Sequence, residues 1–150
     1  MHSFLDASAE EVHMEQFKGK TTLIVNTATD CQFTKQYAEM EFFYREYKDK
    51  GFHIIAFPSG NFGHSSGNTE AHIEFCKNKF DITFTIALKC HVNKEPLPGV
   101  YEYLRKFCKN EKEIDGDFEK FLLLKNGNIL NFSPQTTISE FKNIIIEDLG

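Results

Sequence analysis

Apolar residues along the chain form short runs that alternate with stretches of helical periodicity. The run from Thr21 to Asn26 is short, β-branched and apolar, which is typical of a buried strand. From Thr34 to Lys48 the apolar residues recur at helical spacing, and Gly51 ends this predicted helix. The run from Phe52 to Phe57 predicts a second buried strand, which Pro58 stops. This strand–helix–strand unit predicts two parallel strands joined by a right-handed crossover.

The middle of the chain favours helices. A loop rich in Gly and Ser covers 59–67, and Asn68 after it is expected to cap a helix that reaches about Phe80. Cys76 falls on the apolar stripe of that helix. A further helix fits the residues from Gly99 to Cys108.

The last third of the chain carries the clearest local signals. The apolar runs 118–125 and 128–132 flank Asn126-Gly127, a pair that favours a two-residue type I′ hairpin. Thr137 and Glu140 have the spacing of a capping box and predict a last helix. The element order is therefore βαβ, a helical region, then ββα. We expect a single domain over 1–150 of the α/β class, with a thioredoxin-like fold: a central mixed sheet flanked by helices.

Charge and hydropathy exclude several functions. The formal net charge is −5 and the basic residues are scattered among acidic ones, so neither a nucleic-acid surface nor docking on an anionic membrane is expected. No apolar run approaches the roughly 20 residues of a membrane span. The N-terminal residues lack the basic and apolar regions of a signal peptide, so we expect a cytoplasmic protein.

The cysteines and histidines do not form a metal-binding pattern. The four cysteines, at positions 31, 76, 90 and 108, include no CxxC pair, and in a reducing compartment we expect free thiols. The six histidines show neither HExxH spacing nor a Cys-His cluster, so surface or capping roles are expected for them. We expect no metal and no other cofactor.

Cys31 lies between the first predicted strand and the first predicted helix. Parallel α/β sheets place functional groups there, at the carboxyl ends of their strands. A cysteine in the first turn of a helix is near free N–H groups and the positive end of the helix dipole, which favour the thiolate. Position alone leaves two interpretations open, a reactive cysteine and a buried structural one.

Several stretches, in the same order and at similar spacing along nearly the whole chain, resemble the glutathione peroxidase family. They are Val25 to Thr34 (VNTATDCQFT), Lys50 to Gly63 (KGFHIIAFPSGNFG), Glu74-Phe75-Cys76, Phe118 to Leu122 (FEKFL), Asn126-Gly127-Asn128 and Ser133 to Thr137 (SPQTT).

The resemblance implies a thiol peroxidase that reduces hydrogen peroxide or organic hydroperoxides and serves as an antioxidant in oxidative stress. Cys31 would attack the peroxide and become a sulfenic acid. Cys76 matches the resolving cysteine of the thioredoxin-dependent branch, although a buried core cysteine is the alternative. Thioredoxin, or less favourably glutathione, would be the reductant. Cys90 and Cys108 match nothing in the family and are interpreted as incidental thiols. We expect a monomer, because the chain lacks an obvious inserted loop.

The sequence departs from the family where Gln, Trp and Asn complete the active site. Asn61 stands at the Gln position, where it would orient the peroxide or stabilise the thiolate, and Gly116 and Asp117 stand at the Trp and Asn positions. Gly116 removes an indole donor, and an ionised Asp117 only accepts hydrogen bonds and would disfavour the thiolate of Cys31. Either the match is shifted locally around Gly116, or the site is weakened. The rival hypothesis is therefore a degenerate family member that acts as a redox sensor or binding module.

Overall fold

The computed structural model describes residues 2–63, 67–94, 96–108, 114 and 116–150. The strands are β1 (Ser3–Leu5), β2 (Glu11–His13), β3 (Thr22–Thr27), β4 (His53–Pro58), β5 (Thr85–Ile86), β6 (Lys120–Leu123) and β7 (Ile129–Phe132). The helices are α1 (Gln36–Tyr47), α2 (Thr69–Phe80), α3 (Gly99–Leu104) and α4 (Ile138–Leu149). Single 3-10 turns occur at Met14–Phe17, Lys48–Lys50 and Arg105–Phe107.

The main sheet has five strands in the order β5-β4-β3-β6-β7. β3 pairs in parallel with β4, and β4 pairs in parallel with β5. On the other side of β3, the strands β6 and β7 pair antiparallel. The predicted βαβ unit and ββα unit are therefore confirmed, and they share β3 as a central strand. β5 and the small β1–β2 hairpin were not predicted from the sequence.

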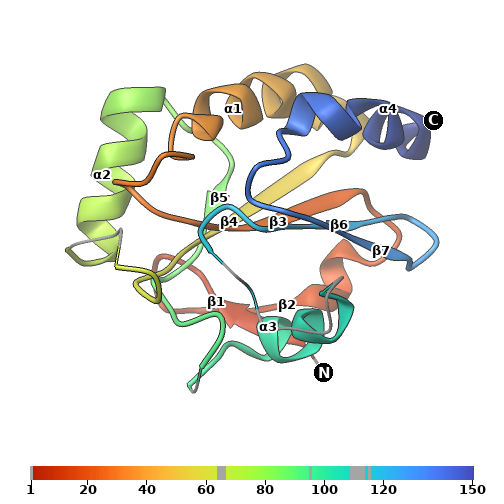
Figure 1. Cartoon of the computed structure of the whole chain (residues 1–150). Helices are drawn as coiled ribbons and strands as arrows, with labels where there is room; N and C mark the ends of the chain where they lie inside the picture. The colour runs from red at the N-terminus through yellow and green to blue at the C-terminus, as the bar shows by residue number, and fades with distance from the viewer. Residues whose placement is uncertain (1, 64–66, 95, 109–113, 115) are drawn as a thin grey trace.

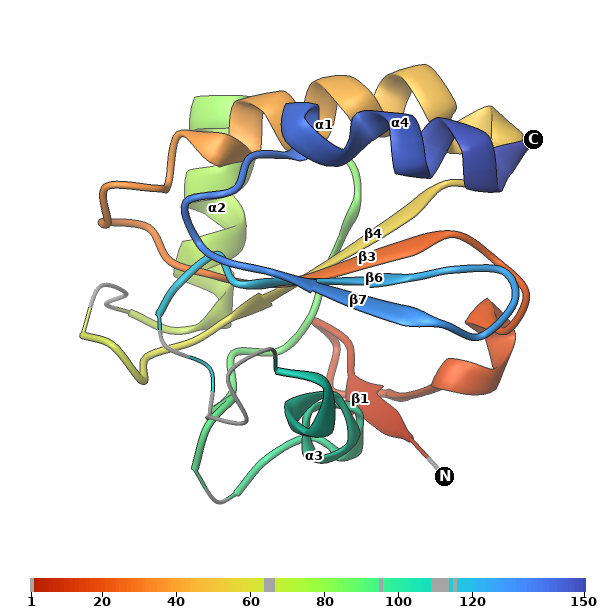
Figure 2. The same cartoon turned by 45° about the vertical axis from the view of Figure 1, so that its right-hand side comes forward.

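Each face of the sheet carries its own hydrophobic core. Alternating residues of the buried strand β3 point to opposite faces, so that Leu23 and Val25 join one cluster and Ile24 joins the other. Figures 1 and 2 show α1 and α4 side by side over one face, while α3 and β1 cover the other face. Both views also place α2 beside the end of the sheet from which α1 begins. No helix in the described parts of the chain is long and apolar enough to cross a membrane.

Local capping agrees with the predictions at two helices. The backbone N–H of Ala71 donates to the side-chain oxygen of Asn68, the predicted N-cap of α2. The N–H of Thr137 donates to the carboxylate of Glu140, as a capping box requires.

Three predicted details are wrong. The hairpin is not a two-residue type I′ turn, because 124–128 separate β6 from β7 and only Gly127 has a positive φ there, of 92°. The N–H of Gly127 donates to the carbonyl of Leu124, which makes a wider turn. The helix predicted for Gly99 to Cys108 is α-helical only to Leu104. The first helix begins at Gln36, two residues later than predicted.

Candidate active site

Cys31 lies in a turn between β3 and α1. Because α1 begins only at Gln36, Cys31 is not in the first turn of the helix, contrary to the prediction. The turn is closed instead by the N–H of Thr34, which donates to the Cys31 carbonyl at 3.1 Å. The Cys31 side chain is partly exposed and packs against the core cluster on the α1 face. The turn therefore presents the thiol at the surface while its backbone stays fixed.

Two donors lie close to the Cys31 sulfur. The backbone N–H of Phe33 points at Sγ with a distance of 3.3 Å, and the Thr34 hydroxyl oxygen lies 3.5 Å from Sγ. The same hydroxyl lies 3.0 Å from the Ala28 carbonyl and accepts the N–H of Cys31. Its single proton can serve only one acceptor at a time. A thiolate at Cys31 would compete for that proton, so Thr34 can add a second donor when negative charge develops on the sulfur.

The sheet brings the other predicted site residues to the same edge. β4 runs parallel to β3, and the segment that leaves it carries Asn61. β6 runs antiparallel to β3, so Gly116 and Asp117 approach the carboxyl end of β3. The Asn26 amide donates to the Gly116 carbonyl at 3.0 Å, which ties this segment to β3.

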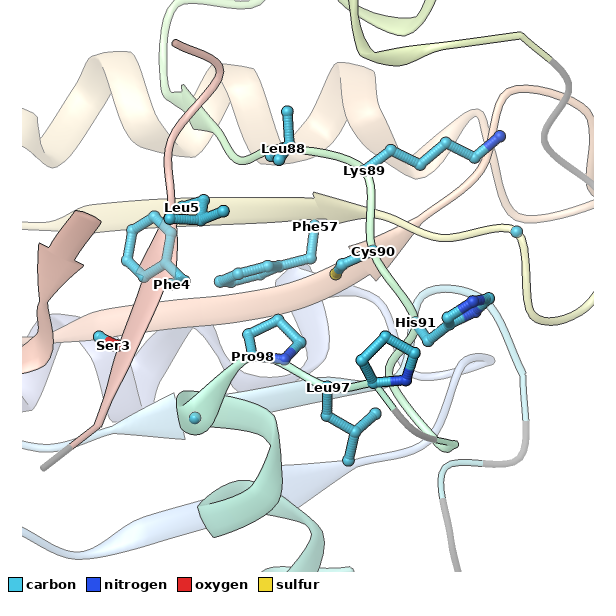
Figure 3. Close-up of a pocket in the computed structure, with 13 residues that line it drawn as sticks. Ser3, Phe4, Leu5, Phe57, Leu88, Lys89, Cys90, His91, Leu97 and Pro98 are labelled. Carbon is cyan, nitrogen blue, oxygen red and sulfur yellow. The ribbon is translucent and has the colours of Figure 1, made fainter. Parts of the chain in front are cut away.

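The side chain of Asn61 is held by His91, for which the sequence predicted only a surface or capping role. Its carbonyl oxygen accepts from the N–H of Val92 at 2.6 Å and from the Ser59 hydroxyl at 3.0 Å. Its amide nitrogen lies 3.1 Å from Nδ1 of His91, which belongs to the segment after β5 (Figure 3). Among the described residues no hydrogen bond joins Asn61 to Cys31. The role of Asn61 toward the peroxide stays a prediction.

Gly116 and Asp117 are the residues predicted to stand at the Trp and Asn positions of the family. A Cβ added at Gly116 would have Pro134 Cγ as its nearest neighbour, at 3.8 Å, which is an ordinary van der Waals contact. Glycine is therefore not required there by crowding of the backbone. The Asp117 side chain is buried, with 4% of its surface exposed. The catalytic importance of both positions remains a prediction.

A buried lysine that the sequence analysis missed holds the same edge together. Lys120 is fully buried, and its ammonium donates to the carbonyls of Phe118, Pro134 and Ser133 at 2.6, 3.2 and 3.4 Å. Burial lowers the pKa of Lys120 to about 7, although nearby carboxylates act in the opposite direction. The Gln36 amide also donates to the Pro134 carbonyl, at 2.8 Å. Lys120 thus fixes the segment that carries Gly116 and Asp117 against the segment at Pro134.

Cys76 occupies the opposite kind of environment. It lies on α2 with no exposed surface, inside the core cluster that Cys31 only borders. Burial raises the pKa of the Cys76 thiol to about 11, while a side-chain hydrogen bond with Tyr37 lowers it in part. The alternative interpretation of Cys76 as a core thiol therefore describes its resting position.

His72 holds the first half of α2 in place. Its Nε2 lies 2.7 Å from the Tyr37 hydroxyl and 3.4 Å from the Thr27 hydroxyl, so it bridges α1 and β3. His72 is 2% exposed, and burial together with the nearby charge of Lys89 lowers its pKa to about 4. The expected surface or capping role is therefore wrong for His72, which is a neutral, hydrogen-bonded core residue.

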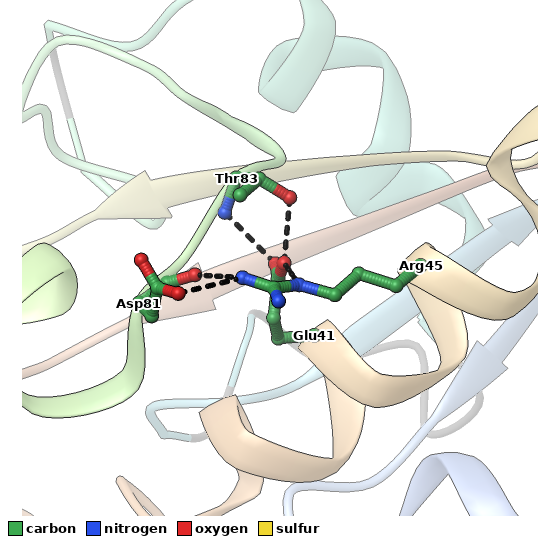
Figure 4. Close-up of polar contacts among 4 residues, drawn as sticks. All are labelled: Glu41, Arg45, Asp81 and Thr83. Atoms are coloured by element: carbon green, nitrogen blue, oxygen red, sulfur yellow. Dashed lines mark hydrogen bonds and ion pairs between the residues drawn. The ribbon is translucent and has the colours of Figure 1, made fainter.

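A charged network holds the other end of α2 (Figure 4). The Glu41 carboxylate accepts from the Thr83 N–H at 2.9 Å and also from the Thr83 hydroxyl and the Arg45 guanidinium. Arg45 in turn donates to the carbonyl and the carboxylate of Asp81, the residue that caps α2. The Glu41–Arg45 pair that helical spacing suggests is therefore one part of a clamp between α1 and the end of α2.

The remaining cysteines are free and lie on the other face of the sheet. Cys90 and Cys108 both belong to the second core cluster or pack against it. Burial raises the pKa of Cys90 to about 12. The thiol of Cys108 donates to the carboxylate of Glu119 at 3.6 Å. Among the described residues no group of three or more His, Cys, Asp or Glu could hold a metal ion.

Comparisons with known proteins agree with this arrangement. The family described as glutathione peroxidase matches residues 1–105. Glutathione peroxidase-like peroxiredoxin 2 of Saccharomyces cerevisiae is 41% identical over 136 residues, which cover 87% of this chain and 84% of that protein. A glutathione peroxidase of Lactococcus lactis is 36% identical over 153 residues, covering 95% of this chain and 97% of that protein.

Solved structures support the same relationship. The crystal structure of T. cruzi GPX1 aligns with a TM-score of 0.77 at 27% identity, covering 99% of this chain and 94% of that one. A thiol:disulfide interchange protein of the thioredoxin family from Chlorobium tepidum aligns with a TM-score of 0.69 at 14% identity over 99% of this chain and 92% of that one, a likeness of fold alone. The predicted thioredoxin-like fold is confirmed, and the chain belongs to the glutathione peroxidase family.

Proposed function

We propose that this chain is a cysteine-dependent peroxidase in which Cys31 attacks the peroxide, Cys76 resolves the product and a thioredoxin-like protein restores both thiols. One observation carries the assignment to Cys31. Its sulfur is partly exposed at the carboxyl edge of the sheet and already receives the N–H of Phe33 at 3.3 Å. The names of the relatives, glutathione peroxidase and glutathione peroxidase-like peroxiredoxin, support the same reaction class.

The reaction is balanced by thiol chemistry alone. The Cys31 thiolate attacks one peroxide oxygen, an S–O bond forms, the O–O bond breaks and the leaving oxygen is protonated to water or an alcohol. The Cys76 sulfur then attacks the Cys31 sulfenic acid, so that an S–S bond forms and water leaves. A dithiol protein exchanges with this disulfide, supplies two electrons and two protons to restore both thiols, and leaves as an oxidised disulfide. Glutathione is the second candidate reductant. No metal or other cofactor takes part in this proposal.

The chain supplies donors for the attacking sulfur and for the peroxide. Phe33 and Thr34 stabilise charge on the sulfur, because their donors lie at 3.3 and 3.5 Å from it. The Asn61 amide gives one hydrogen to His91, and we assign its second hydrogen to a peroxide oxygen.

Resolution requires α2 to open, because Cys76 has no exposed surface. The hydrogen bond between His72 and Tyr37 has to break before the first half of α2 can move. The Glu41 network lies beyond Cys76 in the sequence and can stay intact during that motion. We infer that α2 unwinds from its first half, with its far end as the fixed point.

The rival function, a degenerate redox sensor or binding module, rests on Gly116 and Asp117 at the Trp and Asn positions. The comparisons do not favour it, since the relatives described above carry the names of peroxidases and peroxiredoxins. Equal, negligible turnover in the wild type and in Cys31→Ser would revive it.

Peroxide consumption tests the proposal. It is measured with a thioredoxin system and with glutathione for the wild type, Cys31→Ser and the control Cys108→Ser, a buried thiol on the other sheet face. Loss of the nucleophile is expected to lower turnover by at least about a thousandfold, while Cys108→Ser keeps it. Turnover that survives in Cys31→Ser would overturn the assignment.

We also propose a cellular compartment and an oligomeric state for this protein. Four cysteines without a disulfide suit a reducing compartment, which favours a cytoplasmic enzyme of antioxidant defence. The lack of an obvious inserted loop in the sequence favours a monomer. Fractionation of the source cells tests the compartment, and sedimentation of the purified chain tests the monomer.

A further inference from the structure

A cavity of about 610 Å³ lies on the sheet face opposite α1 and α4 (Figure 3). It opens between β1, the end of β4, the segment after β5 and the segment that leads into α3. This volume falls within the range of about 300–1,000 Å³ that is usual for small-molecule sites. No reacting group of the proposed peroxidase lies in this cavity, although His91 of its lining also contacts Asn61.

The walls of the cavity are apolar and incompletely packed. Apolar side chains of the lining that Figure 3 labels include Phe4, Phe57, Leu88, Leu97 and Pro98. Leu5 at the edge is 43% exposed, and neither Leu88 nor Leu97 is fully buried. These leucines line a hollow instead of packing into the core, so a ligand that fills it would remove apolar surface from water.

The polar groups of the cavity gather mainly at one end, where Gly60, Lys89 and His91 lie. Lys89 is the one charged residue among the described residues of the lining, which include no carboxylate. Figure 3 shows the Lys89 side chain extending away from the apolar walls, where its ammonium donates to the Gly67 carbonyl at 2.8 Å and keeps its positive charge at the rim. This end of the cavity therefore favours an anionic head group.

His91 adds a directed donor at the same end. Because the Asn61 oxygen already accepts from Val92 and Ser59, its amide nitrogen must be the atom that faces His91 Nδ1, at 3.1 Å. Nδ1 consequently accepts a hydrogen bond, and the proton of the neutral ring is on Nε2. The rim of the cavity thus combines a fixed N–H donor with a nearby cation.

We propose that this cavity binds a single-chain amphiphile with a carboxylate head, the chemistry of a fatty acid. The tail lies among Phe4, Phe57 and Leu97, and the head faces His91 and Lys89. The cavity is a second site, separate from Cys31, and its ligand need not react. Cys90 lines it with its sulfur among the apolar side chains, where the thiol can report on occupancy.

Calorimetric titration with octanoate, decanoate and dodecanoate tests this site. Affinity is expected to rise about threefold to fourfold per added methylene, as burial of an alkyl chain requires. Dodecyltrimethylammonium, with a similar tail and a cationic head, is expected to bind at least about tenfold more weakly. No binding of dodecanoate at about 1 mM, or equal binding of the cation, would overturn the proposal.

Variants locate the binding and separate it from catalysis. Leu97→Asp is expected to weaken dodecanoate at least about tenfold, while the matched control Phe42→Asp, at a 61% exposed side chain on α1, leaves binding unchanged. Unchanged binding in a folded Leu97→Asp would place the ligand elsewhere. Binding is expected to persist in Cys31→Ser, so a failure of the proposed peroxidase would leave this test intact.

Labelling of Cys90 gives a second readout that does not depend on heat signals. Methyl methanethiosulfonate modifies the thiols, and peptide mass mapping measures the rate at Cys90. Dodecanoate is expected to slow labelling of Cys90 in the wild type and not in Leu97→Asp. If dodecanoate leaves the labelling rate of Cys90 unchanged in the wild type, the cavity is not its site.

Discussion

Cys31 packs against the edge of a hydrophobic cluster, and Cys76 lies inside the same cluster. The two cysteines differ in exposure, in backbone position and in the groups near their sulfur atoms. Cys31 is partly exposed in a turn and has donors from Phe33 and Thr34 aimed at its sulfur. Cys76 is fully buried on a helix, and burial raises its thiol pKa to about 11. The first thiol is accessible as it stands, whereas the second would have to move before it could meet the first.

This difference separates two physical requirements. Attack on a small peroxide needs access and a stabilised thiolate, which a rigid turn can provide. Resolution needs two sulfurs to meet, so it depends on how easily α2 opens. The same helix protects Cys76 from direct oxidation while no disulfide is being made. The contacts of His72 in the first half of α2 should therefore set the rate of the second step without affecting the first, while the Glu41 network keeps the far end of α2 fixed.

After the loss of Cys31 itself, the largest expected effect comes from removing the second thiol. Cys76→Ser should lower thioredoxin-supported turnover at least about thirtyfold, because the sulfenic acid has no internal partner. The first oxidation of Cys31 by one equivalent of peroxide should stay within about twofold of the wild type. Stopped-flow and steady-state measurements on the same preparation check both rates. If Cys76→Ser slows the first oxidation of Cys31 as much as it slows turnover, the two cysteines do not serve separate steps.

Lowering the pH should reduce the stability that His72 contributes by packing α2 against α1 and β3. The folded pKa of His72 is lowered to about 4 from the ordinary 6.5, so the unfolded chain binds more protons between these values. Stability from this group is complete above pH 6.5 and is lost as pH falls through 4, an effect of about 3 kcal/mol. Urea unfolding across this window should show a shallower loss in His72→Gln. If His72→Gln shows the same pH dependence of stability as the wild type, His72 is not a buried, neutral residue. The control is His13→Gln, at an exposed histidine.

The clamp at the far end of α2 should have a smaller effect on stability. Glu41→Gln should cost about 1–3 kcal/mol, because the amide nitrogen would face donors from Thr83 and Arg45 at a buried position. Asp81→Asn, at the exposed end of the same network, should remain close to wild type. Urea unfolding compares the two variants, and an equal loss in both would mean that Glu41 is not the centre of the clamp.

The smallest effect concerns the neighbourhood of Cys31. Asp117→Asn replaces a buried carboxyl group at the edge of the sheet by an amide, the group that the resemblance gives to the family at this position. The rate of Cys31 oxidation should rise about twofold to fivefold, because less negative charge opposes the thiolate. Competition kinetics against a reference peroxidase measures this rate. A slower variant would show that Asp117 supports the site in its present form.

The fold could be predicted where several neighbouring residues indicate the same element. The apolar runs of β3 and β4, the Asn68 cap and the Thr137 capping box each combine several consistent residues. β5 and the β1–β2 hairpin escaped prediction because strands of two or three residues carry no measurable period. The type I′ turn was wrong because the strands end several residues from Asn126-Gly127 and leave room for a wider turn.

The site could be predicted only in part for a related reason. Cys31 follows a recognisable strand, so its place at the edge of the sheet is visible in the sequence. His72 and Lys120 look like surface residues, and their burial arises from packing between segments far apart in the chain. The partner of Asn61, His91, lies 30 residues further along the sequence and could not be identified without the fold.

Peptide mapping after exposure to one equivalent of peroxide tests the central contrast most directly. The reduced protein is oxidised, alkylated and digested, and each of the four cysteines is followed separately. We predict a Cys31–Cys76 disulfide as the main product, with Cys90 and Cys108 alkylated as free thiols. In Cys76→Ser the oxidation should stop at a sulfenic acid on Cys31. Oxidation that falls first on Cys90 or Cys108, or that spares Cys31, would contradict the account.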